Sequence, residues 1–237
     1  MRRLFRRLIP FRIRKKIHVW KHRVEDCVQG IQFASLDTEE VDFEVLLIHE
    51  QAIMPSKNYS QKVHNFQLAI DQIETVVIKP NQVFSFNHIV GEGCAERGYQ
   101  KSRSLNKGVL IQTYGGGLCQ LAGLIYQASL QIGLNVIERH NHSVDIYTDD
   151  TRYTPLGSDA TISYAFKDLR IQNNHSCSFR FRFQITDHKI SLSIESTDPV
   201  PVHNVVYQIV QTEPQKVVHT KNHHHETVAI SVYDQLS

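Results

Sequence analysis

A run of three glycines, Gly115, Gly116 and Gly117, leads directly into Leu118, Cys119 and Gln120. Glycine accepts the positive φ angles of a tight turn, and the apolar segment from Leu121 to Leu130 predicts a helix after that turn. Cys119 would then lie in the first helical turn, where unpaired N–H groups and the helix dipole favour a thiolate over a thiol. A thiolate is a nucleophile and a metal ligand, so Cys119 is the first candidate for chemistry.

Two histidines, His140 and His142, follow the predicted helix. A helix from Cys119 to about residue 132 would be roughly 20 Å long, and a returning strand from Leu134 to His140 would have about the same length. An antiparallel helix and strand of equal length bring their open ends together. Either His140 or His142 is therefore expected near Cys119, and the spacing does not choose between them as the base.

Several further segments occur in a fixed order along the chain. They are Pro80–Asn87, Val90–Gly91, Ala95–Tyr99, Gly115–Gln120, Glu138–Ser143 and Asp159–Thr161. In this order they resemble the successive blocks of the VanW family, over roughly residues 60–196, and several blocks in sequence are more specific than one motif. The layout resembles the short, leaderless members. The resemblance implies a setting in glycopeptide (vancomycin) resistance and cell-wall metabolism, and it implies no particular reaction.

The matched blocks assign expected roles to individual residues. Asp159 lies in one of them and is the favoured group to orient the histidine, with Asp145 as the alternative. The side chain of Gln120 and the backbone N–H groups of Cys119 and Gln120 are expected to bind an oxyanion. The alternative for Cys119 is a small apolar residue, buried where the turn meets the helix.

Arg97, Tyr99 and the three glycines are the candidate ligand-binding residues. The planar guanidinium of Arg97 suits a carboxylate or a phosphate, although Arg97 can equally tie its own loop to Glu92 or Glu96. The glycines lack the Lys-Ser/Thr pair of a P-loop and the spacing of the dinucleotide fingerprint, so no nucleotide site is expected.

No cofactor is expected, and the alternative is a zinc site. A His-x-His strand projects His140 and His142 to one side, and Cys119 would supply a third ligand, which leaves one position open. The sequence offers no clear fourth ligand. The favoured function is a Cys-His hydrolase or transferase acting on an amide or a peptidoglycan-precursor peptide. The rival is a non-catalytic binding module for a cell-wall peptide or glycan, or an interaction partner of a cell-wall enzyme.

The positive charge is concentrated at the start of the chain. Residues 1–16 hold eight Lys and Arg residues and no acid, and because the whole chain carries +2, the remainder carries −6. Leu4, Phe5, Leu8 and Ile9 would share one face of a short helix that Pro10 ends. This pattern suits electrostatic contact with anionic lipid or nucleic acid, and the alternative is a solvated or disordered leader that packs loosely.

No uninterrupted apolar segment suggests a signal peptide or a transmembrane helix. A cytoplasmic location is therefore expected, with contact at the inner membrane face. Four cysteines without close spacing, Cys27, Cys94, Cys119 and Cys177, are expected to be reduced thiols. Nothing resembles a nucleic-acid-binding module, so no specific nucleic-acid partner is expected.

The periodicities predict an α+β fold in which the helix that starts near Cys119 packs on a mainly antiparallel sheet or meander. Strands are expected at residues 41–48, 134–140, 162–166, 179–185 and 190–194, and a helix at 61–73. Residues 76–78 and 83–86 flank a predicted hairpin or tight corner. The expected organisation is a basic leader and linker (1–35), an α+β domain (36–200) and a peripheral C-terminal extension (201–237).

Overall fold

The structure is a computed structural model, and it describes residues 10–36, 41–106, 108–145, 152 and 154–235. Its helices are α2 (Phe11–Val28), α3 (Tyr59–Ile73), α4 (Phe86–Ile89), the 3-10 helix η1 (Ala95–Arg97) and α5 (Leu118–Gln131). Its strands are β1 (Ser35–Leu36), β2 (Glu44–Ala52), β3 (Val76–Ile78), β4 (Val83–Ser85), β5 (Lys101–Asn106), β6 (Val109–Tyr114), β7 (Asn135–Glu138), β8 (Arg170–Gln172), β9 (Phe179–Thr186), β10 (Lys189–Ser196), β11 (Val206–Gln211), β12 (Gln215–Lys221) and β13 (Thr227–Asp234). The fold is α+β, as the sequence predicts.

The largest sheet contains five strands in the order β1-β3-β9-β10-β2, and all its neighbours pair antiparallel. Buried and more exposed side chains alternate along β9 and β10, so the sheet has one apolar and one more polar face. This follows because every second side chain of a strand points the same way. Phe179 and Phe181 on β9 and Leu192 on β10 are almost fully buried. This apolar face packs against α5.

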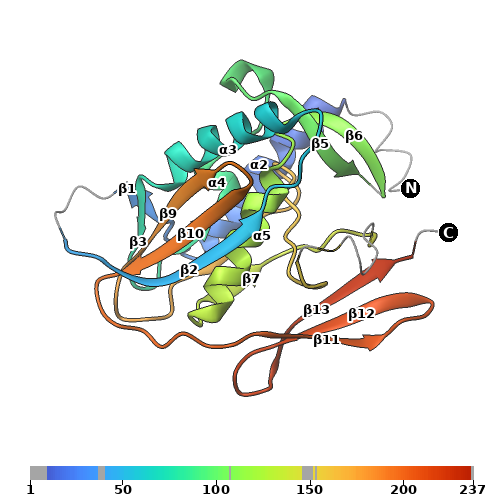
Figure 1. The fold of residues 1–237 in the computed structure, drawn as a ribbon. Helices are drawn as coiled ribbons and strands as arrows, with labels where there is room; N and C mark the ends of the chain where they lie inside the picture. Colours follow the sequence, from blue (N-terminus) through green and yellow to red (C-terminus); the bar gives the residue numbers. More distant parts are fainter. Residues whose placement is uncertain (1–9, 37–40, 107, 146–151, 153, 236–237) are drawn as a thin grey trace.

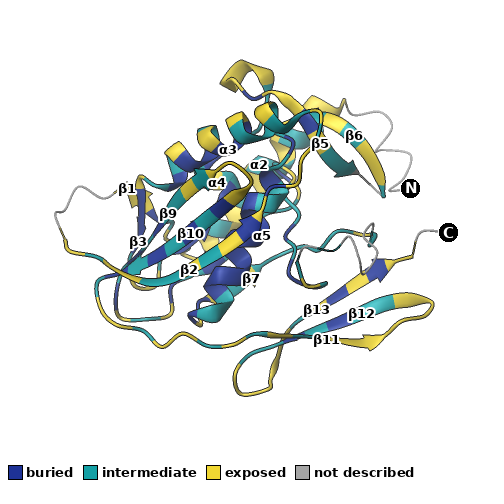
Figure 2. Cartoon of the chain, viewed as in Figure 1, coloured by how far each residue is buried: buried dark blue, intermediate teal, exposed yellow. Residues whose placement is uncertain are grey.

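Helix α5 is the centre of the core. It is apolar over most of its circumference, and its middle turns, from Leu121 to Ser129, are buried. Figure 2 shows this helix largely in dark blue, beside β7 and the strands β2 and β10 of the large sheet. A helix held on several sides fixes the position of its first turn, and Cys119 lies in that turn.

Three smaller sheets complete the fold. They are the antiparallel sheet β4-β8-β7, the hairpin β5-β6 and the C-terminal sheet β11-β12-β13. The C-terminal sheet lies below α5 and β7 in the view of Figure 1. The hairpin β5-β6 leads into the glycine turn before α5, so the end of the hairpin and the N-terminus of the helix lie at the same turn.

Several local expectations need correction. Residues 162–166 form a turn and not a strand, because Ser163 bridges Lys167 and Ala165 takes a φ of 72°. Of the two alternatives for residues 76–86, the tight corner is the one observed, since β3 and β4 belong to different sheets. The short helix expected before Pro10 lies outside the described residues, whereas an unexpected helix, α2, begins directly after Pro10.

Candidate functional site

The glycine turn is shaped by close backbone contacts on several sides. Gly115 and Gly117 have φ angles of 71° and 103°, values that only glycine adopts easily. A Cβ on Gly116 would lie 2.3 Å from the carbonyl oxygen of Ser102 on β5. The turn therefore needs all three glycines, two for their backbone angles and one for the approach of a neighbouring strand. It ends at Gly117, which caps α5.

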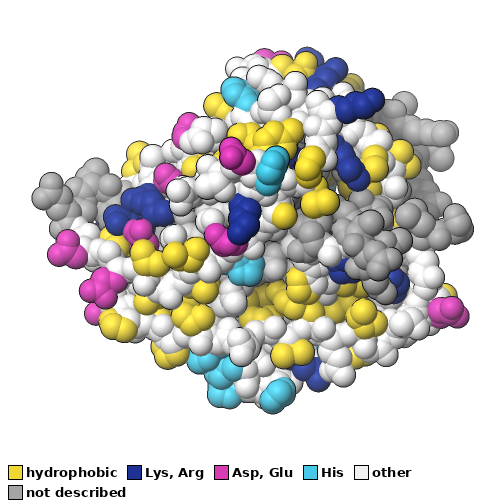
Figure 3. Space-filling view, viewed as in Figure 1, with side chains coloured by type: hydrophobic (Ala, Val, Ile, Leu, Met, Phe, Trp, Pro, Cys, Tyr) yellow, Lys and Arg dark blue, Asp and Glu magenta, His cyan; other side chains and the backbone are white. Residues whose placement is uncertain are grey.

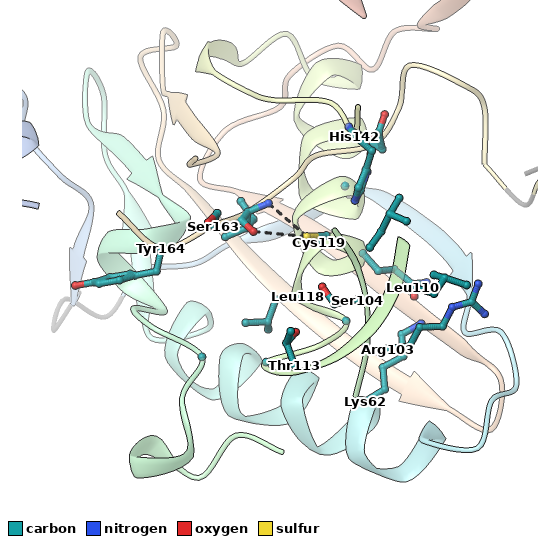
Figure 4. Close-up of a pocket in the computed structure, with 18 of the residues that line it drawn as sticks. Lys62, Arg103, Ser104, Leu110, Thr113, Leu118, Cys119, His142, Ser163 and Tyr164 are labelled. Atoms are coloured by element: carbon teal, nitrogen blue, oxygen red, sulfur yellow. Dashed lines mark hydrogen bonds and ion pairs between the residues drawn. The ribbon is translucent and has the colours of Figure 1, made fainter. Parts of the chain in front are cut away.

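Cys119 is half-buried in the first turn of α5, and its thiol contacts the backbone of Ile162. The Ile162 N–H donates to Sγ at 3.4 Å, and Sγ lies 3.8 Å from the Ile162 carbonyl oxygen (Figure 4). The N–H of Gln120 is bonded to the Gly117 carbonyl oxygen at 2.8 Å. The N–H of Cys119 makes no hydrogen bond within the described part of the chain, as expected of a first-turn amide.

His142 and Asp159 form the closest charged pair near the thiol. The carboxylate oxygen Oδ2 of Asp159 accepts from the backbone N–H of His142 at 2.7 Å and lies 2.6 Å from its ring Nδ1. Because Nδ1 is held in this way, the other ring nitrogen, Nε2, is left for a different partner. Figure 4 shows the ring of His142 on the same side of the cavity as Cys119.

Burial lowers the pKa of His142, but the hydrogen bond to Asp159 and interactions with Cys119 outweigh it and raise that pKa to about 10. Burial likewise opposes the charged form of Asp159, and the hydrogen bond from His142 together with the charge of Arg139 lowers its pKa to about 2. At neutral pH the pair is therefore an imidazolium and a carboxylate. A protonated ring beside Cys119 can stabilise a thiolate or donate a proton.

Two residues that the sequence did not single out hold Asp159 in place. Arg139 is 6% exposed, and its Nη2 lies 3.1 Å from Asp159 Oδ1, while its Nε donates to the Asp159 carbonyl oxygen at 2.6 Å. The Tyr233 hydroxyl donates to the same Oδ1 and accepts the Gly157 N–H at 3.0 Å. Tyr233 comes from β13, so the C-terminal sheet supplies part of the site. Arg139 stands beside the histidine pair in the sequence, whereas nothing local marks Tyr233.

His140 is placed differently from His142. Its Nε2 lies 3.0 Å from Glu138 Oε1, and its carbonyl oxygen accepts the Thr161 N–H. The ring does not line the cavity that contains Cys119. Within the described residues no three His, Cys, Asp or Glu side chains are arranged to hold a metal ion, and the three ligands of the zinc alternative do not converge.

The other predicted site residues divide into two groups. Gly115, Gly117 and Gln120 line the cavity, although the Gln120 amide donates to the Ala52 carbonyl oxygen at 2.8 Å rather than pointing free. Arg97 and Tyr99 do not line it. Arg97 donates to the carbonyl oxygens of Val90 and Glu92 and to the Gln72 side chain, so it ties its loop together through backbone groups, and Tyr99 is 3% exposed.

The cavity itself measures about 390 Å³ and lies between α5, the β5-β6 hairpin and the segment around residues 154–164. Its lining includes Cys119, His142 and Asp159 on one side and Lys62 and Arg103 on another. A volume of this order accommodates a small peptide or a group of similar size. The arrangement offers a thiol, a protonated imidazole and an orienting carboxylate in one hollow.

Comparison with known proteins gives one family. A sequence model described as "VanW like protein" matches residues 61–195. The Vancomycin B-type resistance protein VanW of Enterococcus faecalis (strain ATCC 700802 / V583) is 31% identical over 129 residues, which are 54% of this chain and 47% of that protein. The uncharacterized protein YoaR of Bacillus subtilis (strain 168) is 32% identical over 145 residues, 61% of this chain and 46% of that protein. The chain spans about half the length of these curated relatives. No solved structure matches it.

Proposed function

The chain belongs to the family of VanW-like proteins, and from that premise we propose that it is a cysteine acyl-transfer enzyme, a hydrolase or transferase, acting on an amide of a cell-wall precursor peptide. The observation that carries the proposal is the order Cys119, His142, Asp159 around one cavity, with His142 Nδ1 bonded to Asp159 at 2.6 Å. A nucleophile, a base and an orienting third group are the usual components of covalent acyl transfer.

In this mechanism the Cys119 thiolate attacks the carbonyl carbon of the substrate amide. The resulting oxyanion accepts a hydrogen bond from the unpaired N–H of Cys119 at the start of α5. Protonated His142 gives its proton to the leaving amine, and the C–N bond breaks to leave a thioester on Cys119. Water or an acceptor amine, deprotonated by the now neutral His142, then attacks the thioester and releases the thiolate.

Asp159 acts throughout as a positioning residue. Its carboxylate fixes the ring nitrogen Nδ1 of His142, and Arg139 and Tyr233 fix the carboxylate in turn. A ring held in this way presents only Nε2 to the reacting groups. The proton on Nδ1 stays on the side of Asp159, so the neutral ring keeps the tautomer in which Nε2 can act as a base.

The relative's name, vancomycin resistance protein, supports the choice of substrate class. We propose on this basis a role in cell-wall metabolism linked to glycopeptide resistance. The second candidate is a binding module without chemistry. It is favoured by one observation, namely that the backbone N–H and carbonyl oxygen of Ile162 both contact the thiol of Cys119.

The deciding experiment is alkylation of Cys119 by iodoacetamide, followed by peptide mass mapping because three other free cysteines are present. His142→Ala is expected to slow the reaction at pH 7 by about tenfold or more, since loss of the imidazolium removes stabilisation of the thiolate. His140→Ala is the matched control, because that ring faces Glu138, and it is expected to react at the wild-type rate.

A thiol that reacts slowly in wild type and in both variants would overturn the enzyme proposal and leave the binding module. A complementary test incubates the wild-type protein with short acyl-peptide amides and looks for a thioester adduct by mass. The adduct is expected on Cys119 and is expected to be absent in Cys119→Ser.

A further inference from the structure

Two basic side chains in the Cys119 cavity, Lys62 on α3 and Arg103 on β5, lack the acidic partner that the other charged lining groups have. Three charged pairs line the same cavity: Lys15 with Glu92 at 2.5 Å, Arg152 with Asp145 at 2.7 Å and His142 with Asp159 at 2.6 Å. Lys62 and Arg103 form no ion pair with any described residue. The cavity therefore contains an uncompensated positive end.

The glycine turn places these two cations next to the start of α5. A Cβ on Gly117 would lie 2.8 Å from Lys62 Cγ, so the Lys62 stem packs directly over this glycine. A Cβ on Gly116 would lie 3.0 Å from the Arg103 carbonyl oxygen. Because α3 and β5 press on two sides of one turn, the Lys62 stem and the Arg103 backbone are both anchored beside the turn that leads to Cys119. Figure 4 shows them side by side, on the opposite side of Cys119 from Tyr164.

The environment of Lys62 is unfavourable for a charge without a partner. Burial, and then the charge of Arg103, lowers the pKa of Lys62 to about 8. The contact of its ammonium with the Phe66 ring, 5.6 Å from the centroid, is attractive but supplies no negative charge. Two like charges that face one another in a partly buried cavity repel. A bound anion would offset both this repulsion and the burial of the Lys62 charge.

We infer that Lys62 and Arg103 form a subsite for an anionic group of the ligand, either a carboxylate or a phosphate. The reacting carbonyl of the same ligand would reach Cys119. The guanidinium fork of Arg103 matches two oxygens of such a group, and the Lys62 ammonium adds a point charge. This inference rests on the proposed function only for the position of the reacting carbonyl. Anion binding itself requires no chemistry at Cys119.

Calorimetric titration of the full chain carrying Cys119→Ser tests the subsite without turnover. The probes are an alanyl-alanine dipeptide with a free carboxylate, the same dipeptide as its C-terminal amide, and inorganic pyrophosphate. We expect the free carboxylate or pyrophosphate to bind, with the stronger of the two identifying the anion, and the amide to bind about tenfold more weakly or worse.

Lys62→Gln with Arg103→Gln is expected to abolish the difference between acid and amide. Lys101→Gln, on the same strand but outside the cavity lining, is the matched control and is expected to bind as its parent does.

Three results would each overturn the subsite: no binding of either anion, equal binding of acid and amide without binding of pyrophosphate, and unchanged anion binding in the double variant. A second readout follows the ε-methyl signal of reductively methylated Lys62 by NMR. We expect the pKa of Lys62 to rise when the anion is added, and an unchanged titration would contradict the inference. If the alkylation experiment fails while carboxylate-dependent binding persists, only the enzyme proposal is lost.

An independent surface lies on the outer side of α2. Ile13, Ile17, Trp20 and Val24 recur at three- and four-residue spacing, so they share one helix face. Their exposed fractions are 50%, 49%, 67% and 41%, which is unusual for a row of large apolar side chains. Three exposed basic residues, Arg12, Lys16 and Arg23, lie along one edge of this row.

The opposite face of α2 attaches the helix to the protein. Lys15 pairs with Glu92, and Asp26 pairs with Arg170 at 2.6 Å. Phe11 and His18 contact the Phe166 ring. The apolar row therefore points away from the protein, because the inner side of the helix is already occupied. On the face drawn in Figure 3, by contrast, acidic and basic side chains are interspersed.

We propose that the outer face of α2 binds an anionic lipid surface in the interfacial plane. An apolar row that contains a tryptophan and is bordered by Lys and Arg has the composition of interfacial helices, in which apolar groups enter the acyl boundary and basic groups meet the headgroups. No helix in the described residues is long and apolar enough to cross a membrane. Phe11 and Lys15 also line the Cys119 cavity, so attachment by α2 would bring that cavity close to the bilayer.

Trp20 is the sole tryptophan of the chain, which makes its fluorescence a direct probe. We expect its emission to shift to shorter wavelength with phosphatidylglycerol vesicles and to stay unchanged with phosphatidylcholine vesicles. Lys16→Gln with Arg23→Gln is expected to weaken vesicle binding about thirtyfold, since each basic group near the surface contributes about 1 kcal/mol. Lys57→Gln with Lys101→Gln, an equal charge change elsewhere, is expected to bind like wild type.

Three results would overturn the lipid proposal. One is equal binding to both kinds of vesicle. Another is a Trp20 shift that depends on protein concentration without lipid and accompanies a dimer mass in sedimentation, which would assign the face to a second copy. The third is a shift with duplex DNA but not with vesicles.

Discussion

One oxygen of Asp159 receives two hydrogen bonds from the same residue, His142, through its backbone N–H at 2.7 Å and its ring Nδ1 at 2.6 Å. This double contact fixes both the position and the rotation of the imidazole. The other oxygen of Asp159 is occupied by Arg139 and Tyr233. The ring of His142 is thus oriented by Asp159, which Arg139 and Tyr233 hold in turn, and these residues come from three separated parts of the chain.

Asp159→Asn is expected to remove the negative charge that balances His142 and Arg139. Breaking a largely buried ion pair by removing one partner costs about 3–5 kcal/mol, because the remaining charges stay buried. Urea denaturation measures the free energy of unfolding. Asp198→Asn, at an exposed position, is the control and is expected to change that free energy by less than about 0.5 kcal/mol. A loss below 1 kcal/mol in Asp159→Asn would contradict the pairing.

The pair also predicts how stability depends on pH. The pKa of His142 is raised from 6.5 to about 10, so its contribution is fully present below pH 6.5 and is lost as the pH rises through 10. The pKa of Asp159 is lowered from 3.8 to about 2, so its contribution is present above pH 3.8 and is lost as the pH falls through 2. Denaturation of wild type and His142→Gln should therefore differ most between pH 4 and 6.5 and converge toward pH 10. A constant difference from pH 6 to 10 would refute the shift.

Tyr233→Phe is expected to affect the site from the end of the chain. The variant keeps the buried ring but loses the hydroxyl that donates to Asp159 and accepts from Gly157 N–H. A lost hydrogen bond to a charged group costs about 1.5–3 kcal/mol. Iodoacetamide labelling of Cys119 should also slow, because His142 is held less firmly. Tyr207→Phe, on β11 of the same sheet and without a bond to Asp159 in the described contacts, is the comparison and should leave the labelling rate unchanged.

Gly116→Ala is expected to distort the turn before α5. Its Cβ would stand 2.3 Å from the Ser102 carbonyl oxygen, a backbone atom that cannot move without displacing β5. A strained insertion of this kind typically costs 1–3 kcal/mol, so the melting temperature should fall by roughly 5 °C or more. Gly123→Ala is the matched control in the same helix region, where the nearest atom would be 3.5 Å away, and it should melt at the wild-type temperature or slightly above it.

Asp168 gives a second pH prediction, in the direction opposite to that of Asp159. Burial, only partly offset by hydrogen bonds from Ser85 and the Asn87 N–H, raises the pKa of Asp168 from 3.8 to about 6. A raised carboxyl pKa gives stability that is present below pH 3.8 and is lost as the pH rises through 6. Asp168→Asn should therefore become more stable relative to wild type between pH 4 and pH 8. A relative stability that falls over this interval would show that the hydrogen bonds dominate.

Short-range patterns in the sequence were sufficient to predict several of the main helices and strands. The helical period from Val63 to Ile73 predicts α3, and the alternation of Phe179, Phe181 and Phe183 predicts β9. The glycine run predicts a turn with positive φ and places Cys119 in the first turn of the next helix. These features follow from local backbone preference and periodic burial, which depend on neighbouring residues.

The tertiary structure decided which of these elements meet. Equal helix and strand lengths allowed either histidine to reach Cys119, and only the fold turns His142 toward the cavity and His140 toward Glu138. Residues 162–166 alternate like a strand but form a turn, in which Ser163 bridges Lys167 and Ala165 takes a φ of 72°. Tyr233, Lys62 and Arg103 join the site across long separations in sequence. Sequence by itself determined local backbone and periodicity, whereas contacts between distant segments depend on packing that no local pattern encodes.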